Sequence, residues 1–349
     1  MPMLLSGCAG GDVTVGTDES VVESVSETLD KGTESDRASS NQDYPKNMWI
    51  MKTEKGVSVR HVTIDVDGDI EPIEIVQITD MHISYVNEQD LADPVIKSTY
   101  ENRSWGKNGG FMSNAIKCLE YAKNTDQIVL TGDIYDYLTE ETAKQVKEKI
   151  FDKYSNIMAV VGNHEPVRQV QGKVTENTTL EQRLDILQRM WANDIYYSSK
   201  VIGDKVMLIQ MDNGSAGVFL DSQIPLLRAD LMKARENGYA VLLFYHIPLS
   251  TGNSKYYSTK AITVGDAGNT FANFYSIGIN ASSSGASGEI YNLIINNGDI
   301  IKGCFCGHKH CDYYTEIDAK TADGTATVIP QYILIGAAYG PNVLKVTVK

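Results

Sequence analysis

The amino-acid sequence predicts an α/β fold, and two observations support this prediction. From Tyr44 to the C-terminus, short runs rich in β-branched and aromatic residues alternate with longer runs of helical periodicity. Polar motifs and long irregular segments come directly after several strand-like runs, which is where α/β proteins place their functional loops. The 349 residues, 42% of them hydrophobic, are enough to bury a large core.

The expected elements form two series along the chain. In the first series, the sequence predicts strands at 57–66, 73–79, 128–132 and 157–162, and helices at 112–123 and 140–151. In the second, it predicts strands at 195–202, 205–211, 240–246, 301–307, 327–336 and 342–348, and helices at 180–191, 222–237 and 289–296. Segments 84–110, 166–178 and 248–288 are expected to be irregular insertions.

The first 43 residues differ in composition from the rest of the chain. Residues 9–43 are rich in Ser, Thr, Glu, Asp and Gly and contain no aromatic residue, so we expect a disordered acidic spacer. Residues 1–8 resemble the end of a bacterial lipoprotein signal, in which Cys8 would carry the lipid after cleavage. This resemblance implies an extracytoplasmic protein, attached to a bacterial membrane only through that lipid; an ordinary disordered tail is the alternative.

Charge and cysteine content restrict the possible partners. The net charge of −14 argues against binding to a nucleic-acid duplex or an anionic membrane through a basic surface. It also disfavours anionic substrates unless bound cations reverse the field locally. The five cysteines indicate no disulfide framework, and Cys304 and Cys306 are expected in the core.

Five short blocks follow strand-like runs, and five of the six histidines fall in them. Carboxylates and imidazoles suit first-row metals such as Mn, Fe and Zn. Residues i and i+2 at a strand end can reach one ion, and a preceding glycine lets the backbone turn toward the cleft. We therefore expect a metal site at the strand ends. In chain order the blocks are Asp80-Met81-His82, Gly132-Asp133-Ile134-Tyr135-Asp136, Gly162-Asn163-His164-Glu165, His246 and Gly307-His308-Lys309-His310.

In order and spacing, these blocks resemble the pattern D-x-H, G-D-x-x-D, G-N-H-[DE], a lone His and G-H-x-H of the calcineurin-like metallophosphoesterases. The resemblance covers residues 57–349. It implies two mixed β-sheets packed as a sandwich and flanked by helices, a four-layer arrangement. It also implies one catalytic domain, residues 44–349, with its site at the C-terminal ends of the strands.

The resemblance further implies a pair of divalent or trivalent ions, Mn, Fe or Zn. In such a pair a bridging hydroxide is the nucleophile, and both ions hold the phosphoryl oxygens. His164 is implied to protonate the leaving group, and Asp136 to orient the imidazole of His164. One ion is implied at Asp80, His82, Asp133 and His310, and the other at Asp133, Asn163, His246 and His308, so that Asp133 bridges them.

The chain departs from two subclasses of this family. Protein Ser/Thr phosphatases carry arginines after the second and third blocks to bind the substrate phosphate, but this chain has Tyr137 and Pro166 there. Purple acid phosphatases have a metal-binding tyrosine at the position of Asp136. Both subclasses are therefore disfavoured. The candidates to replace the missing arginines are Arg103, Lys107 and Arg168, with solvated surface charge as the alternative for each.

The sequence thus predicts a metal-dependent hydrolase that cleaves the phosphate ester of a small phosphorylated substrate. The missing arginines favour a phosphodiester slightly over a phosphomonoester. The alternative is a non-catalytic surface protein that binds metal or a phosphorylated ligand on the same fold. Because every block is complete, including His164, the enzyme is favoured. The oligomeric state is not determined by the sequence.

Overall fold

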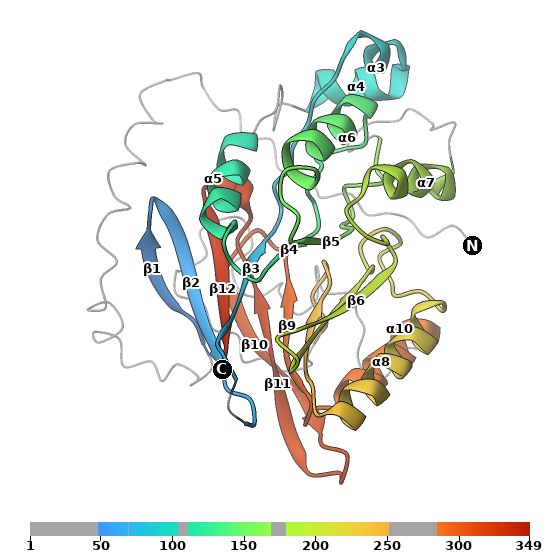
Figure 1. Ribbon diagram of the computed structural model, residues 1–349. Helices are drawn as coiled ribbons and strands as arrows, with labels where there is room; N and C mark the ends of the chain where they lie inside the picture. Colours follow the sequence, from blue (N-terminus) through green and yellow to red (C-terminus); the bar gives the residue numbers. More distant parts are fainter. Residues whose placement is uncertain (1–47, 69, 104–110, 169–178, 251–284) are drawn as a thin grey trace. The chain divides into compact units, whose positions relative to one another are not determined.

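The fold is built on two six-stranded mixed β-sheets (Figure 1). The computed structural model describes residues 48–68, 70–103, 111–168, 179–250 and 285–349. The chain divides into two units, Met1–Asp43 and Tyr44–Lys349, and the described residues all belong to the second unit. The predicted lipid attachment site at Cys8 and the predicted spacer lie outside the described residues.

The first sheet presents three parallel strand ends along one edge. Strands β3, β4 and β5 run parallel, whereas β12 runs antiparallel to β3 and β1 antiparallel to β2. Because β4 is covered on both faces, all five of its residues are buried. The strand order is β1 (Ile50–Glu54), β2 (Val57–Ile64), β12 (Asn342–Val348), β3 (Ile73–Ile78), β4 (Gln127–Thr131) and β5 (Ile157–Val160).

The second sheet has a parallel centre and antiparallel edges. Strands β11, β9, β8 and β7 run parallel, and β10 and β6 pair antiparallel at the two edges. The strand order is β10 (Tyr313–Lys320), β11 (Ala326–Ile333), β9 (Ile301–Cys306), β8 (Ala240–Phe244), β7 (Val206–Met211) and β6 (Tyr197–Ile202).

Helices cover the outer face of each sheet. Helices α5 (Met112–Ala122), α6 (Glu140–Val146) and α7 (Leu180–Met190) share a buried apolar cluster with the first sheet. Helices α8 (Gln223–Asn237) and α10 (Gly285–Ile295) share another with the second, which includes Cys304 and Cys306. Among the described residues, no helix combines the length and apolar character needed to cross a bilayer.

A third apolar cluster fills the space between the two sheets. It joins Val129 and Val346 of the first sheet to aromatic residues of the second. The rings of Phe244 and Phe305 stack with centroids 5.0 Å apart, and Tyr332 stacks on Phe305 at 5.2 Å. The layers therefore follow the order helices, first sheet, second sheet and helices, with an apolar cluster between each layer and the next. This arrangement confirms the predicted sandwich.

Several predicted elements need correction. Segment 84–110 was wrongly predicted to be irregular, because it contains α3 (Glu88–Ala92) and α4 (Pro94–Asn102). A capping box of Asn87 and Asp90 begins α3, and Asp93 caps α4. These helices are too short to show a clear apolar period. Strands β1 and β10 were not predicted, and the predicted helix 140–151 ends in a π-helical turn, Lys147–Phe151. Helix α10 begins at Gly285, four residues before its predicted start.

Candidate metal centre

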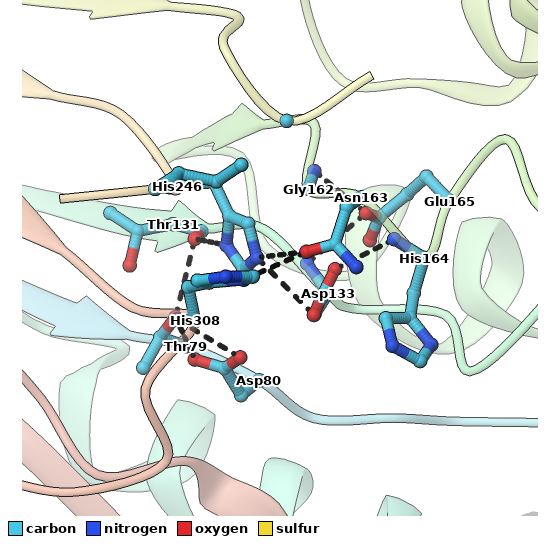
Figure 2. A network of polar contacts seen from close by, with 12 residues as sticks. Thr79, Asp80, Thr131, Asp133, Gly162, Asn163, His164, Glu165, His246 and His308 are labelled. Carbon is cyan, nitrogen blue, oxygen red and sulfur yellow. Dashed lines mark hydrogen bonds and ion pairs between the residues drawn. The ribbon is translucent and has the colours of Figure 1, made fainter. Parts of the chain in front are cut away.

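The seven candidate ligands lie directly after the C-terminal ends of five strands. Figure 2 shows five of them, Asp80, Asp133, Asn163, His246 and His308. Three of these strands belong to the first sheet and two to the second, so the site joins both sheets. The structure brings all the candidate ligands together. Asp80 and His82 follow β3, Asp133 follows β4, Asn163 follows β5, His246 follows β8, and His308 and His310 follow β9.

The backbone at these positions is strained. Among the described residues, seven other than glycine have positive φ, and five of them are candidate ligands with φ between 46° and 71°. Such a conformation costs about 1–3 kcal/mol at each residue and persists only where the surroundings fix it, typically at functional sites. The five are Asp80, His82, Asp133, His308 and His310.

Gly132 shows why small residues precede the ligands. Its φ is +87°, and a Cβ atom at this position would lie 2.5 Å from Nδ1 of His246. Any other residue would therefore displace the His246 ring and adopt an unfavourable backbone conformation.

The first cluster of ligand atoms is formed by four residues, whose candidate ligand atoms lie within 4.8 Å of one another. Nε2 of His82 lies 3.0 Å from Nε2 of His310, 3.9 Å from Oδ1 of Asp80 and 3.8 Å from Oδ2 of Asp133. Nε2 of His310 lies 3.2 Å from Oδ1 of Asp80.

The second cluster lies on the other side of Asp133. Nε2 of His246 lies 3.2 Å from Oδ2 of Asp133 and 3.1 Å from Oδ1 of Asn163. Nδ1 of His308 lies 2.8 Å from the same oxygen of Asn163. Because Asp133 belongs to both clusters, its carboxylate is the only described group that could bridge two ions held by these residues.

The rings of three histidines are fixed from behind. Nδ1 of His82 lies 3.0 Å from Oδ1 of Asp136, and Nδ1 of His246 lies 2.7 Å from the main-chain oxygen of Thr131. Nδ1 of His310 lies 3.1 Å from the hydroxyl of Tyr339. Such contacts orient the ring and leave Nε2 facing the cluster, as metal-ligating histidines require. Imidazole nitrogens with carboxylate and amide oxygens suit first-row metals, so the residues fit a dinuclear centre.

The sequence model of calcineurin-like phosphoesterases matches residues 73–312, which is more than half of the chain. The chain belongs to the calcineurin-like phosphoesterase family. It is accordingly a metal-dependent phosphoesterase, which confirms the enzyme class predicted from its blocks. No curated protein matches this phosphoesterase significantly in sequence.

Solved structures with a similar arrangement of the chain are distant in sequence. A dimetal phosphatase from Danio rerio is 12% identical, with a TM-score of 0.41 over 76% of this chain and 88% of that one. A purple acid phosphatase from yellow lupin seeds is 14% identical, with a TM-score of 0.43 over 81% of this chain and 46% of that one. The NAD nucleotidase of Haemophilus influenzae is 13% identical, with a TM-score of 0.38 over 78% and 46%.

Burial and neighbouring charges shift the pKa values of the phosphoesterase's ligands in opposite directions. Burial lowers the pKa of His82 to about 4, and burial together with His246 lowers that of His308 to about 3. Burial also acts to lower the pKa of His246, but the carboxylate of Asp133 outweighs it and raises the pKa to about 10. His82 and His308 are therefore neutral at neutral pH, the form that binds metal.

Asp136 does not hold His164 in the way the sequence predicted. Its carboxylate lies 3.7 Å from Nδ1 of His164 but 3.0 Å from Nδ1 of His82. The imidazole of His164 instead donates Nδ1–H to the main-chain oxygen of Asp136, at 2.8 Å. The carboxylate of Asp136 instead contacts Nδ1 of His82 and the guanidinium of Arg103.

Glu165 connects two loops of the site. Its carboxylate accepts hydrogen bonds from the main-chain N–H groups of Gly162, Asp133, Ile134 and Tyr135, at 2.5–3.1 Å. Burial and the nearby Asp133 raise its pKa to about 8. Glu165 thus joins the loop after β4 to the loop after β5.

Asn213 was not identified from the sequence. Its Oδ1 accepts from the main-chain N–H groups of His246 and Ile247, and its Nδ2 donates to the carbonyl of Ile247. It therefore fixes the backbone on which His246 stands. The turn-forming sequence Asp212-Asn213-Gly214 after a strand was the signal that could have identified Asn213. For His310, the residue missed was Tyr339, near the C-terminus.

Two of the three residues proposed to replace the missing phosphate-binding arginines lie among the described residues. Neither is a solvated surface charge. Arg103 binds the carboxylate of Asp136, and its side chain is 15% exposed. Arg168 pairs with Asp93, the N-cap of α4, and is 16% exposed. Lys107 lies outside the described residues.

Proposed function

We propose that this phosphoesterase hydrolyses a phosphate ester by means of two metal ions. Asp80, His82, Asp133 and His310 would hold one ion, and Asp133, Asn163, His246 and His308 the other. The observation that carries the proposal is the position of Asp133, whose carboxylate belongs to both ligand clusters. Mn, Fe and Zn all suit these ligands.

When bound, the ions would lower the pKa of a water molecule and stabilise the charge that develops on the phosphoryl oxygens. We propose that His164 acts on the leaving group. Its ring lies edge-on to that of His82 with centroids 4.7 Å apart, and its side chain is 18% exposed, so a substrate can reach it. Because Nδ1 donates to Asp136, Nε2 is the nitrogen that would carry the proton to the leaving oxygen.

The main chain connects His164 to the metal centre. Its N–H donates to Oδ1 of Asp133 at 2.8 Å (Figure 2). The acid and the bridging carboxylate therefore keep a fixed separation, and positioning of this kind supplies part of the rate enhancement of many enzymes.

We propose that the substrate is a small phosphodiester. The positions at which protein phosphatases carry arginines hold Tyr137 and Pro166, which are both buried. Neither side chain can bind the doubly charged end of a monoester. A diester has a single negative charge and a second substituent, so it needs that contact less. An extracytoplasmic location remains part of this proposal, on the sequence of residues 1–43 alone.

The test is hydrolysis of para-nitrophenyl phosphate and bis-para-nitrophenyl phosphate by metal-free protein reconstituted with Mn, Zn or Fe. We expect metal-dependent turnover, faster with the diester, that is lost in Asp133→Asn. Asp318→Asn, an exposed position on β10, is the matched control. Binding of two ions without turnover of either ester would instead favour the non-catalytic, ligand-binding alternative. Turnover of the monoester alone would contradict the diester proposal.

A further inference from the structure

Helix α4, which lies in the insertion 84–110, ends beside the metal centre and provides a charged residue there. The helix ends at Asn102, and Arg103 is its C-cap residue. Nε of Arg103 donates to Oδ2 of Asp136 at 2.5 Å, and Nη2 donates to Oδ1 at 2.6 Å. The guanidinium therefore spans both carboxylate oxygens, a bidentate geometry that fixes the plane of the carboxylate as well as its charge.

The same carboxylate orients a candidate metal ligand. Oδ1 of Asp136, which Arg103 contacts, also lies 3.0 Å from Nδ1 of His82. Asp136 is completely buried, so these protein partners, and not bulk water, surround its charge. The three side chains form a chain of contacts from the insertion to the ligand cluster, in which each group limits the orientation of the next.

The other end of α4 is fixed to the loop that follows β5. The side chain of Arg168 pairs with Asp93, the N-cap of α4. The hydroxyl of Thr99, in the second turn, donates to the main-chain oxygen of Arg168 at 2.8 Å. Because this loop also carries Asn163 and His164, α4 is held at both ends by segments of the site. The position of Arg103 is thus set by packing that does not depend on Asp136.

We infer that Arg103 is a positioning residue of the metal centre, which acts through Asp136 to fix the ring of His82. The inference rests on the proposed dimetal function. It assigns a role to the insertion: α4 completes the support of the first ion's ligands. A phosphate-binding arginine would act on the substrate directly, and the two roles give different results for metal binding.

The experiment is calorimetric titration of Mn²⁺ into metal-free wild type, Arg103→Ala, Arg103→Lys, Asp136→Asn and the double variant Arg103→Ala/Asp136→Asn. Removing a residue that orients a metal ligand typically weakens metal affinity by about 10–100-fold. We expect a loss of this size at one of two Mn²⁺ sites in Arg103→Ala, and a smaller loss in Arg103→Lys, whose ammonium cannot span both oxygens. Arg228→Ala, which removes an exposed partner of Glu289, is the matched control and should bind Mn²⁺ like wild type.

The double variant decides whether Arg103 acts through Asp136. If it does, Arg103→Ala should change affinity by less than about twofold in the Asp136→Asn background, since coupled residues are not additive. In metal-free protein, the ¹⁵N signals of His82 should also shift in Arg103→Ala, because the carboxylate that accepts from Nδ1 loses its fixed plane. If Arg103→Ala does not fold by circular dichroism, Arg103→Lys provides the same comparison.

Unchanged Mn²⁺ affinity in folded Arg103→Ala, or additive losses in the double variant, would overturn the inference. A rise in KM at unchanged metal affinity would assign Arg103 to substrate binding instead. Failure of the wild type to bind two Mn²⁺ ions would be a different result, because it would overturn the proposed dimetal function and the inference together.

Discussion

Nε2 of His82 and Nε2 of His310 lie 3.0 Å apart, although 228 residues separate them in the chain. The opposite nitrogen of each ring contacts an oxygen, from Asp136 and from Tyr339. Two ring nitrogens this close together in a buried site are stable only with a proton or a cation between them. The fold thus maintains a group of ligand atoms that bound metal would stabilise.

Metal binding should therefore stabilise the protein. A ligand that binds only the folded state, present at 100 times its dissociation constant, adds about 2.7 kcal/mol. We expect the melting temperature to fall on chelation and to recover when Mn²⁺ is restored, as measured by scanning calorimetry. Asp133→Asn, which loses the shared carboxylate, should show a smaller recovery, and Asp318→Asn should match wild type. An unchanged melting temperature after confirmed metal removal would contradict the ligand assignment.

Tyr339 should contribute to metal affinity through its hydroxyl. Tyr339→Phe keeps the ring, which lies 5.4 Å from that of His310, and removes the hydroxyl that contacts Nδ1. Because loss of such a contact typically weakens metal affinity, we expect a decrease approaching tenfold in a Mn²⁺ titration. Tyr239→Phe, on the loop after α8, is the matched control. Equal affinities in both variants would show that the hydroxyl does not orient His310.

The sequence was informative wherever the evidence is local. The strands that precede the ligands are nearly continuous apolar runs, because both of their faces are covered, and each is followed by a short polar block. The block order identified the family and led to the correct sheet sandwich. Helices α3 and α4 were missed because, with five and nine residues, they are too short to show an apolar period. Only their N-cap residues, Asn87 and Asp93, indicated them.

The parts of the site that were missed depend on contacts between distant segments. Asn213 supports His246 from 33 residues away in the chain, and Arg103 contacts Asp136 at the same separation in sequence. No local pattern marks such pairs, since they arise from the way the loops pack. Asp136 was predicted to be a member of the site, but its side-chain partners, His82 and Arg103, come from distant segments.

Asp212 should make stability depend on pH in the metal-free protein. Burial raises its pKa from the ordinary 3.8 to about 6, partly opposed by Ser215, Gly214 and the cationic His246. The folded carboxyl holds its proton more tightly than the unfolded one, so this group's contribution to stability is complete below pH 3.8 and declines as pH rises through 6. The change in stability therefore falls between these two values.

Asp212→Asn should remove that dependence. The amide can keep the bonds that Asp212 accepts from the main-chain N–H groups of Gly214 and Ser215, and can donate to the Ser215 hydroxyl. We expect the variant to match wild type near pH 4 and to be about 1–3 kcal/mol more stable at pH 7, by urea denaturation. A constant difference across this range would show that the carboxyl does not titrate there.

His164 should matter most for substrates with poor leaving groups. If its Nε2–H protonates the leaving oxygen, His164→Ala should lower kcat by about 10²–10⁴-fold for an alkyl phosphate ester, whose alkoxide is strongly basic. The loss should be much smaller for a para-nitrophenyl ester, because para-nitrophenolate departs without a proton. Mn²⁺ affinity should stay close to that of wild type, since only the main-chain N–H of His164 contacts Asp133 and the variant keeps it. Equal losses with both leaving groups, at unchanged metal content, would mean that His164 binds substrate and does not donate the proton.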